Sequence, residues 1–340
     1  MIRRTVGPAL VIALCPPAAM LLWHVNSQEH GSFSALFDAI YHDGLFATVW
    51  AAWGPYVFGS KIAWTIIGVF AGVQLAFMKW LPGPAHEGTE LYPRILGWDI
   101  KHFANSRFSM TAWALIPLCF ASWQFEHFGH LSTSMLVCVT LPLLYLTQFF
   151  YWETGYFGTM DIQHDHAGFY LIWGVLVWVP AVYTSPAMYL TERPVELGWP
   201  LAEGIFLVGA FYITAKNLAN RERIRVRSTD GNTTVWGKAP LIIRAKYRNE
   251  NGEERKNILL ASGFWGVSRH FHYVGEIIGA FCWSVVGGFS NFAPFFYVTF
   301  LSILLLHRGF RDDEKCKTKY GVYWDEYRAL VPWKVLPGVY

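Results

Sequence analysis

The stretch IIGAFCWSVVGGFSNFAPFFYVTFLSILLL, from Ile277 to Leu306, decides the class of fold. It contains no charged side chain, and Gly287, Gly288 and Asn291 lie near its middle. About 20 apolar residues are needed for a helix to cross the hydrocarbon core of a bilayer. The pattern therefore predicts two helical arms joined by a turn, a hairpin whose two ends lie at the same face of a membrane.

Two clusters of polar and aromatic residues flank this apolar run. The first contains Ser262-Gly263-Phe264-Trp265-Gly266 and Arg269-His270-Phe271-His272-Tyr273. The second contains His307, Arg308, Arg311, Asp312, Cys316, Lys319, Tyr320, Trp324 and Tyr327. Because the hairpin brings both clusters to one membrane face, we expect them to form a single C-terminal pocket there. Guanidinium groups bind phosphates and rings stack on bases, so this pocket suits an anionic aromatic cofactor such as a dinucleotide.

The composition indicates a membrane protein throughout. The 340 residues are 54% hydrophobic and only 15% charged, whereas soluble domains carry roughly 25% charged residues. With the hairpin, we expect an all-α polytopic fold of about eight spans. The other predicted spans are Val6–Val25 with a kink at Pro16-Pro17, Ile62–Met78, Met110–Trp123, Thr133–Trp152, Ala167–Leu190 and Leu201–Thr214. The net charge of +3 is small and says nothing about nucleic acid, and we predict no nucleic-acid partner. The five scattered cysteines form neither a metal-ligand spacing nor a disulfide framework.

The distribution of Lys and Arg predicts the orientation. Loops 26–43, 124–132 and 191–198 carry almost none, whereas the N-terminus, residues 79–107, residues 216–256 and the C-terminus are basic. Basic segments face the cytosol by the positive-inside rule. We expect an endoplasmic reticulum membrane in a eukaryote and the inner membrane in a bacterium. Within the basic region, Leu241–Tyr247 and Asn257–Leu260 flank Asn251-Gly252, which predicts a small β-hairpin.

An acidic loop between two predicted spans is a further candidate site. It contains Glu153, Asp161, His164, Asp165 and His166 and has no Lys or Arg, although it should lie at the basic face. Ionisable groups beside membrane segments are costly and are functional candidates by default. The alternatives are a solvated loop or a metal site, but one His pair two residues apart is weak support for a metal, and we predict none.

The basic residues divide into two groups. The charges of residues 216–256 suit anchoring of helix ends at anionic lipid, whereas Arg308 and Lys319 lie among rings and acids. The chain has no glycine-rich Rossmann turn, no Gly-x-Ser-x-Gly and no His-Glu-x-x-His. The residues alone therefore predict a membrane enzyme with a basic, aromatic cytosolic face.

The motifs resemble the sterol reductase family, which includes the sterol C14 reductases, the lamin B receptor and the 7-dehydrocholesterol reductases. The resemblance rests on the two clusters above with the Leu336-Pro337-Gly338 ending, and on Thr159–Tyr170 with Trp178-Val179-Pro180. Tyr183-Thr184-Ser185-Pro186, Pro194–Gly198 and Thr229-Asp230-Gly231 are most similar to the 7-dehydrocholesterol reductase branch. This resemblance implies that the protein catalyses an NADPH-dependent reduction of the C7–C8 double bond of a sterol.

The resemblance also implies roles for individual residues. The residues expected around NADPH are Arg223, Arg227, Trp265, Arg269, His270, Tyr273, Arg308, Asp312, Lys319, Tyr320, Trp324 and Tyr327. Those expected near the sterol are Glu153, Asp161, His164 and Asp165. We expect N-terminal membrane helices in 1–108, cavity-lining helices in 109–215 and the cofactor region in 216–340. The chain departs from the family near residues 81–94, where a longer segment is expected and a pair of spans is predicted to be missing.

Reduction of an alkene needs a proton on one carbon and a hydride on the other. A carboxyl group in an apolar pocket has a raised pKa and can serve as the acid. Asp312, Glu153 and Tyr327 are the candidates for this acid, and the sequence does not choose among them.

The alternative functions are those of a sterol C14 reductase, a non-catalytic sterol-binding protein and a membrane S-adenosylmethionine-dependent methyltransferase. The last rests on Arg269-His270-x-x-Tyr273-x-Gly275-Glu276, which resembles a motif of isoprenylcysteine methyltransferases with Phe271 in place of a proline.

Overall fold

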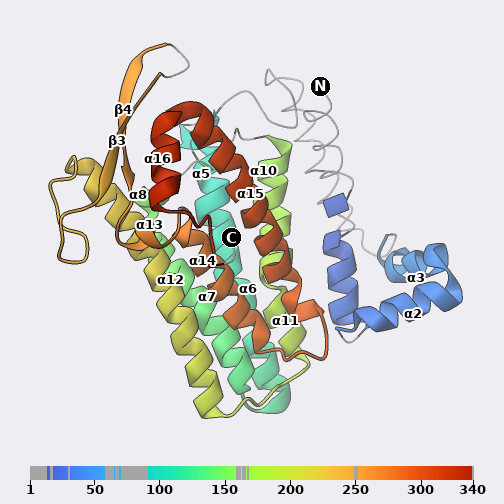
Figure 1. The fold of residues 1–340 in the computed structure, drawn as a ribbon. Coiled ribbons are helices and arrows are strands. Elements are labelled where there is room, and N and C mark those ends of the chain that lie inside the picture. The colour runs from blue at the N-terminus through green and yellow to red at the C-terminus, as the bar shows by residue number, and fades with distance from the viewer. Residues whose placement is uncertain are drawn as a thin grey trace. The chain divides into compact units, whose positions relative to one another are not determined.

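A computed structural model describes residues 14–15, 18–29, 31–57, 65, 69, 91–95, 97–157, 162, 166, 168–248 and 252–338. The chain forms two compact units. Their helices and strands are labelled in Figure 1. The first unit comprises Met1–Leu197 and Val285–Tyr297, and the second comprises Gly198–Ser284 and Val298–Tyr340. The three functional regions predicted from the sequence, 1–108, 109–215 and 216–340, are defined differently from these two units and stay a prediction.

The first unit is helical. Its longer helices are α2 (Phe33–Asp43), α3 (Leu45–Val57), α6 (Met110–Phe128) and α7 (Thr133–Tyr151). Its shorter elements are β1 (Arg94–Ile95), β2 (Trp98–Asp99), α5 (Ile100–His102), η1 (Phe103–Ser109), α8 (Glu153–Tyr156), α10 (Phe169–Trp173), η2 (Gly174–Tyr183), α11 (Ser185–Thr191) and η3 (Ala293–Phe295). The connection between α6 and α7 shows why these helices end where they do. Gly129 adopts a φ of 76° and terminates α6, and the Ser132 side chain accepts a hydrogen bond from Met135 N to cap α7.

Two segments of the first unit are π-helical, η1 and η2, and they pack against each other. Pro180 lies inside η2 and cannot donate a backbone hydrogen bond, which favours the wider π turn. The ring of Trp113 lies beside them, 5.0 Å from that of Tyr183 and 5.3 Å from that of Tyr145. These irregular segments were not predicted from the sequence. The sequence analysis predicted a continuous apolar span, Ala167–Leu190, over η2 and no span over η1.

Four helices among the described residues are long and apolar enough to cross a membrane. They cover Thr133–Tyr151, Leu171–Thr191, Trp199–Ser228 and Ala293–Tyr320. The predicted helical membrane fold is supported to that extent, whereas the number of eight spans stays a prediction. Half of the predicted Val6–Val25 span lies outside the described residues, including its predicted kink at Pro16-Pro17. Nearly all of the Ile62–Met78 span and most of the 81–94 junction also lie outside them.

The second unit combines helices with one β-hairpin. Its elements are α12 (Trp199–Ser228), β3 (Ile242–Arg248), β4 (Glu254–Leu260), α13 (Phe264–Val267), α14 (Phe271–Val285), α15 (Phe296–Tyr320) and α16 (Val322–Leu330), the first residues of α15 belonging to the first unit. The predicted β-hairpin is confirmed, with Ile243 opposite Leu259 and Ile242 opposite Leu260.

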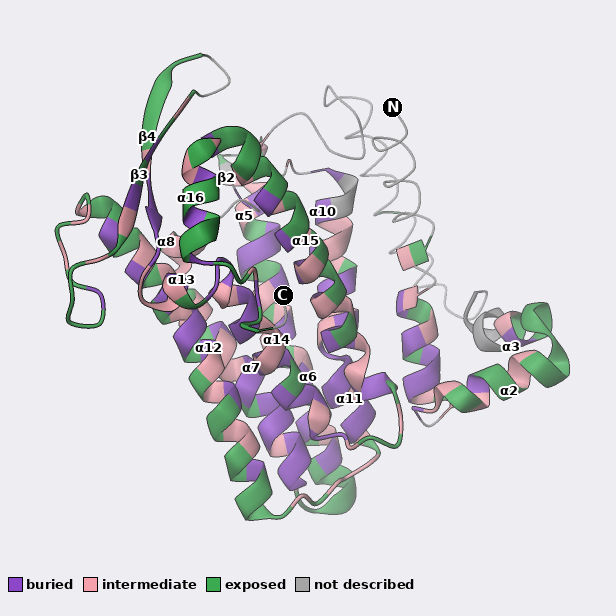
Figure 2. Cartoon of the chain, in the orientation of Figure 1, coloured by how far each residue is buried: buried purple, intermediate pink, exposed green. Residues whose placement is uncertain are grey.

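The base of the hairpin is buried on both faces. Ile243 and Leu259 pack with residues of α15 and α16, while Ile258 and Leu260 pack with Val226 of α12 and with Trp265. Successive side chains of a strand point to opposite faces, which allows one ribbon to serve two hydrophobic clusters. Figure 2 shows the burial concentrated at this base, while Glu254–Lys256, at the other end of β4, are exposed.

Helix α12 is longer than predicted. The sequence places its end near Thr214 because Lys and Arg become frequent there, but the helix continues to Ser228. Its 30 residues have a length of about 45 Å, which exceeds a hydrocarbon core of roughly 30 Å. Lys and Arg are good helix formers, so the charges mark the end of the apolar part of α12 and not the end of the helix.

The predicted arms and turn around Gly287-Gly288 are confirmed. Helix α14 ends at Val285, Gly288 adopts a φ of 76°, and α15 begins at Phe296. Helix α14 also packs closely on α12, because a Cβ at Gly275 would lie only 2.7 Å from both Lys216 Cβ and Tyr212 O. A glycine at this position therefore sets the distance between the two helices.

Candidate functional site

The first part of the site is an arginine lying over a tryptophan. The guanidinium carbon of Arg223, on α12, is 4.2 Å from the centre of the Trp265 ring. The indole Nε1 of Trp265 donates to the carbonyl oxygen of Ala219 at 2.8 Å, which fixes the ring against α12. A cation over a tryptophan face is stabilised by the ring quadrupole. Arg223 and Trp265, both expected around NADPH, therefore contact each other directly, and their contact with a cofactor stays a prediction.

Neither Arg223 nor Arg227 forms an ion pair with a carboxylate in the described part of the chain. Arg223 makes one long hydrogen bond, 3.4 Å, to Asn220 Oδ1, and its buried Nε has no partner there. Arg227, one helical turn further on, donates from Nε to Ile258 O at 3.2 Å. Two neighbouring guanidinium groups without counter-ions form a site that favours an anion.

The second part of the site is centred on Asp312. The Tyr273 hydroxyl donates to Asp312 Oδ2 at 3.1 Å, and Nε of Arg308 lies 3.7 Å from the same oxygen. Oδ1 makes no hydrogen bond to the described residues. The structure thus brings together three of the predicted site residues, Tyr273, Arg308 and Asp312, around one carboxyl group.

Two histidines lie beside this carboxyl group. The ring of His270 stacks on that of Tyr273 with centroids 5.0 Å apart, and burial lowers the pKa of His270 to about 4. Its imidazole is therefore neutral at pH 7. The His272 ring lies 4.3 Å from Tyr273 and 5.2 Å from Trp265, so ring contacts connect Arg223 to Asp312. His272 was not among the predicted site residues, although it belongs to the quoted motif.

Arg269 has a different environment from the one predicted. Its Nη1 donates to the carbonyl oxygens of Val331 and Pro332 at 2.6 and 2.9 Å, and its Nε lies 3.4 Å from Asp313 Oδ1. Trp324 Nε1 also donates to Asp313, at 3.2 Å. Arg269 thus holds the C-terminal segment, and its predicted contact with a cofactor stays a prediction. Sequence reasoning missed Asp313, because nothing in an Asp-Asp pair tells which carboxylate is buried.

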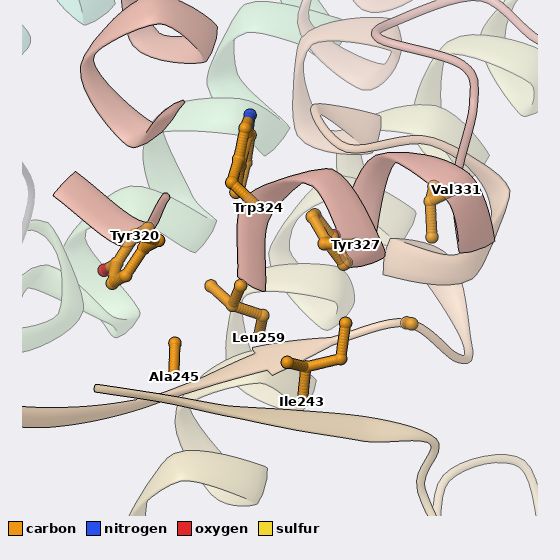
Figure 3. Close-up of a cluster of buried hydrophobic side chains, with 8 residues drawn as sticks. Ile243, Ala245, Leu259, Tyr320, Trp324, Tyr327 and Val331 are labelled. Atoms are coloured by element: carbon orange, nitrogen blue, oxygen red, sulfur yellow. The ribbon is translucent and has the colours of Figure 1, made fainter. Parts of the chain in front are cut away.

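The rings predicted to stack on a cofactor lie in a hydrophobic cluster. Tyr320, Trp324 and Tyr327 are buried against Ile243 and Leu259 of the hairpin (Figure 3). Burial raises the pKa of Tyr327, whose hydroxyl donates to Trp265 O at 3.3 Å. Lys319 is exposed at the edge of this cluster, its Nζ 4.2 Å from the centre of the Tyr247 ring. Their predicted role toward a cofactor remains a prediction, and the observed role of the three rings is packing.

The candidate residues of the first unit are described only in part. Glu153 accepts hydrogen bonds from both terminal nitrogens of Arg107, one of them 2.7 Å long. Asp161, His164 and Asp165 lie outside the described residues. Their predicted contact with a sterol therefore stays a prediction.

The residues of the second unit fit a phosphate-bearing cofactor. Buried polar atoms rarely lack hydrogen-bond partners, yet Arg223 Nε, His270 Nε2 and His272 Nδ1 have none among the described residues. All three belong to the connected series that ends at Asp312 and Arg308. Guanidinium groups at one end and a carboxyl group at the other suit a ligand that carries phosphates and a reacting centre.

The chain is mostly helical and has candidate membrane spans, and the comparisons with known proteins give its family. Residues 84–340 match the ergosterol biosynthesis ERG4/ERG24 family, and the chain belongs to that family of sterol reductases. The predicted family is confirmed.

Similar proteins include reductases of two kinds. The chain is 50% identical over 254 residues to a 7-dehydrocholesterol reductase of Arabidopsis thaliana, a match covering 74% of this chain and 59% of that protein. It is 39% identical over 331 residues to a 7-dehydrocholesterol reductase of Danio rerio, covering 94% of this chain and 67% of that protein. It is 33% identical over 356 residues to a Delta(14)-sterol reductase of Methylotuvimicrobium alcaliphilum, covering 98% of this chain and 78% of that protein.

Proposed function

We propose that this chain reduces a carbon–carbon double bond of a sterol with NADPH, and that the C7–C8 bond of 7-dehydrocholesterol is its substrate bond. The names of its relatives support the reaction class, and two of the three relatives above are 7-dehydrocholesterol reductases. The observation that carries the proposal is the connected series from Arg223 through Trp265, His272 and Tyr273 to Asp312. It provides positive charge for phosphates and a carboxyl group for proton transfer within one unit.

In this proposal Arg223, Arg227, Arg308 and Lys319 bind the phosphates and hold the cofactor. NADPH supplies the hydride when bound. The cationic side chains all lie in the second unit on the long helices α12 and α15, which are rigid supports for a binding site.

Asp312 supplies the proton. Tyr273 and Arg308 both contact Oδ2 and fix the orientation of the carboxyl group, which leaves Oδ1 to carry the transferable proton. The O–H bond breaks as a C–H bond forms on the sterol, and bound NADPH would supply the hydride that the neighbouring carbon then needs. The other two candidates are less suited. Tyr327 is buried in a hydrophobic cluster, and both carboxylate oxygens of Glu153 accept hydrogen bonds from Arg107, whereas Oδ1 of Asp312 has no such partner among the described residues.

The second candidate function is reduction of a C14 double bond, because the Delta(14)-sterol reductase relative is matched over 98% of this chain. The test is incubation of membranes containing the protein with either 7-dehydrocholesterol or a C14-unsaturated sterol, with NADPH, with NADH or without a reductant. We expect NADPH-dependent loss of the conjugated diene of 7-dehydrocholesterol. Reduction of the C14-unsaturated sterol alone would favour the second function, and binding without turnover of either sterol would contradict both.

A further inference from the structure

The helix that carries Trp265 begins without a capping side chain of its own. Helix α13 starts at Phe264, and the preceding residue is Gly263, with a φ of 63°. The first backbone N–H groups of a helix have no partner inside it and need acceptors from outside the helix, such as nearby side chains. Gly263 has no side chain to do this, so the acceptor must come from elsewhere in the chain.

Glu222 of α12 provides this acceptor. Its Oε1 accepts a hydrogen bond of 3.1 Å from the backbone nitrogen of Phe264. Glu222 is only 7% exposed, an uncommon environment for a glutamate. The requirement for glycine follows from this contact, because a Cβ at Gly263 would lie 2.3 Å from Glu222 Oε1 and 2.6 Å from Val235 Cγ1.

This bond is one of two that join α13 to α12. The other is the bond from Trp265 Nε1 to Ala219 O, at 2.8 Å. The two acceptors lie three residues apart on α12, and the residue after Glu222 is Arg223, whose guanidinium lies over the Trp265 ring. A four-residue helix has too few internal hydrogen bonds to hold its own conformation, so these contacts determine where the indole lies.

We infer that Glu222 is a positioning residue for the anion-binding arginine of this site: it fixes the start of α13 so that Trp265 lies under Arg223. This inference rests on the proposed function, since it assigns Arg223 to the cofactor phosphates. Without the bond from Glu222, the indole and the guanidinium both gain freedom. The affinity for the cofactor then decreases, while the proton-transfer group at Asp312 keeps its position.

The first test measures NADPH affinity of the purified full chain by energy transfer from protein tryptophans to the nicotinamide. Removal of one charge-assisted hydrogen bond in Glu222→Ala should raise the Kd by about tenfold and leave kcat at saturating NADPH within about twofold. Glu222→Gln keeps an acceptor at the same position and should restore the Kd to within about twofold of the wild type. Glu203→Ala, an exposed acid on the same helix, is the matched control and should change neither constant.

The second test needs no ligand. The near-UV circular dichroism of Trp265 is obtained as the difference between the wild type and Trp265→Phe, and again in the Glu222→Ala background. We expect the second difference spectrum to be less than about half as intense, because an indole with several orientations gives a weaker signal. If Glu222→Ala proves unstable, Glu222→Asp, whose carboxylate is one methylene shorter, should show the same changes in smaller size.

The outcomes separate the inference from the proposed function. An unchanged Trp265 difference spectrum in Glu222→Ala would overturn the inference, whatever the protein reduces. So would a normal NADPH Kd in that variant, or an equal loss of affinity in Glu222→Gln and Glu222→Ala. Absence of NADPH binding by the wild type would contradict the proposed function, and the difference spectra would still decide whether Glu222 positions Trp265.

Discussion

The hydroxyl of Tyr273 on α14 donates a hydrogen bond of 3.1 Å to Oδ2 of Asp312 on α15. This contact joins the two arms of the predicted hairpin directly beside its polar ends. Since Arg308 approaches the same oxygen, the carboxyl group is held from two sides and cannot rotate freely. A held carboxyl group with one free oxygen is the arrangement that proton transfer to a bound substrate needs.

The first prediction concerns this carboxyl group. Asp312→Asn keeps the shape of the side chain but removes the transferable proton, and should lower the rate of sterol reduction by roughly a hundredfold or more. NADPH affinity should remain within a few-fold of the wild type. The measurement is turnover of 7-dehydrocholesterol at saturating NADPH. The exposed Asp325→Asn serves as the control, and a near-normal rate in Asp312→Asn would move the search to Glu153 and Tyr327.

The second prediction concerns the cationic residues of α15. Arg308→Ala and Lys319→Ala should each raise the Kd for NADPH by roughly ten- to a hundredfold, since a charge-assisted contact is worth about 1.5–3 kcal/mol. Sterol binding should be almost unchanged. Lys315→Ala removes an exposed charge from the same helix and is the control. Normal NADPH affinity in both variants would remove these two residues from the cofactor site.

Much of the fold of the second unit could be predicted from local patterns. Gly287-Gly288 inside an apolar run predicted the turn between α14 and α15, and Asn251-Gly252 between two alternating segments predicted the β-hairpin. These features depend on neighbours in sequence, where glycine and asparagine have direct conformational consequences. The length of α12 was not predicted, because its Lys and Arg residues mark where the apolar part of the helix ends and not where the helix itself ends.

The roles of individual site residues were harder to predict, because they depend on contacts between distant segments. A ring such as Trp324 suits stacking on a cofactor or packing in a core, and only its position among Ile243 and Leu259 distinguishes the two. Glu222 and Asp313 were missed for the same reason. Glu222 is buried beside Gly263, and Asp313 is buried beside Arg269. In each case the partner lies more than 40 residues away in sequence.

The third prediction concerns stability. Asp313 and Arg269 form a buried pair, with side chains 10% and 2% exposed. Asp313→Ala leaves a buried guanidinium without its carboxylate and should lower the free energy of unfolding by about 3–5 kcal/mol. The measurement is thermal unfolding in detergent. Replacing both residues, as Arg269→Met with Asp313→Ala, should recover part of the loss, and no recovery would show that the two side chains act independently.

The fourth prediction concerns orientation. Loop 191–198 carries a single arginine, whereas residues 216–256 are strongly basic, so the loop should face the lumen or periplasm and the basic region the cytosol. In a Cys119→Ser background, which removes an exposed native thiol, Glu192→Cys should react with an impermeant reagent only from the outer side. Asn232→Cys should react only from the cytosolic side. The reverse pattern at both positions would contradict the assignment.

The fifth prediction concerns pH. Burial lowers the pKa of His270 to about 4 in the folded protein, whereas an exposed histidine in the unfolded chain has a pKa of about 6.5. Between these two values the unfolded chain binds the proton and the folded protein does not, so stability falls as pH decreases from about 6.5 toward 4. The slope should reach about 1 kcal/mol per pH unit at most, and His270 should contribute almost no pH dependence above about pH 8. The measurement is the Tm at pH 7 and pH 5 for the wild type and His270→Gln. The wild type should lose more stability than the variant over this interval, and equal losses would show that groups other than His270 carry the acid sensitivity.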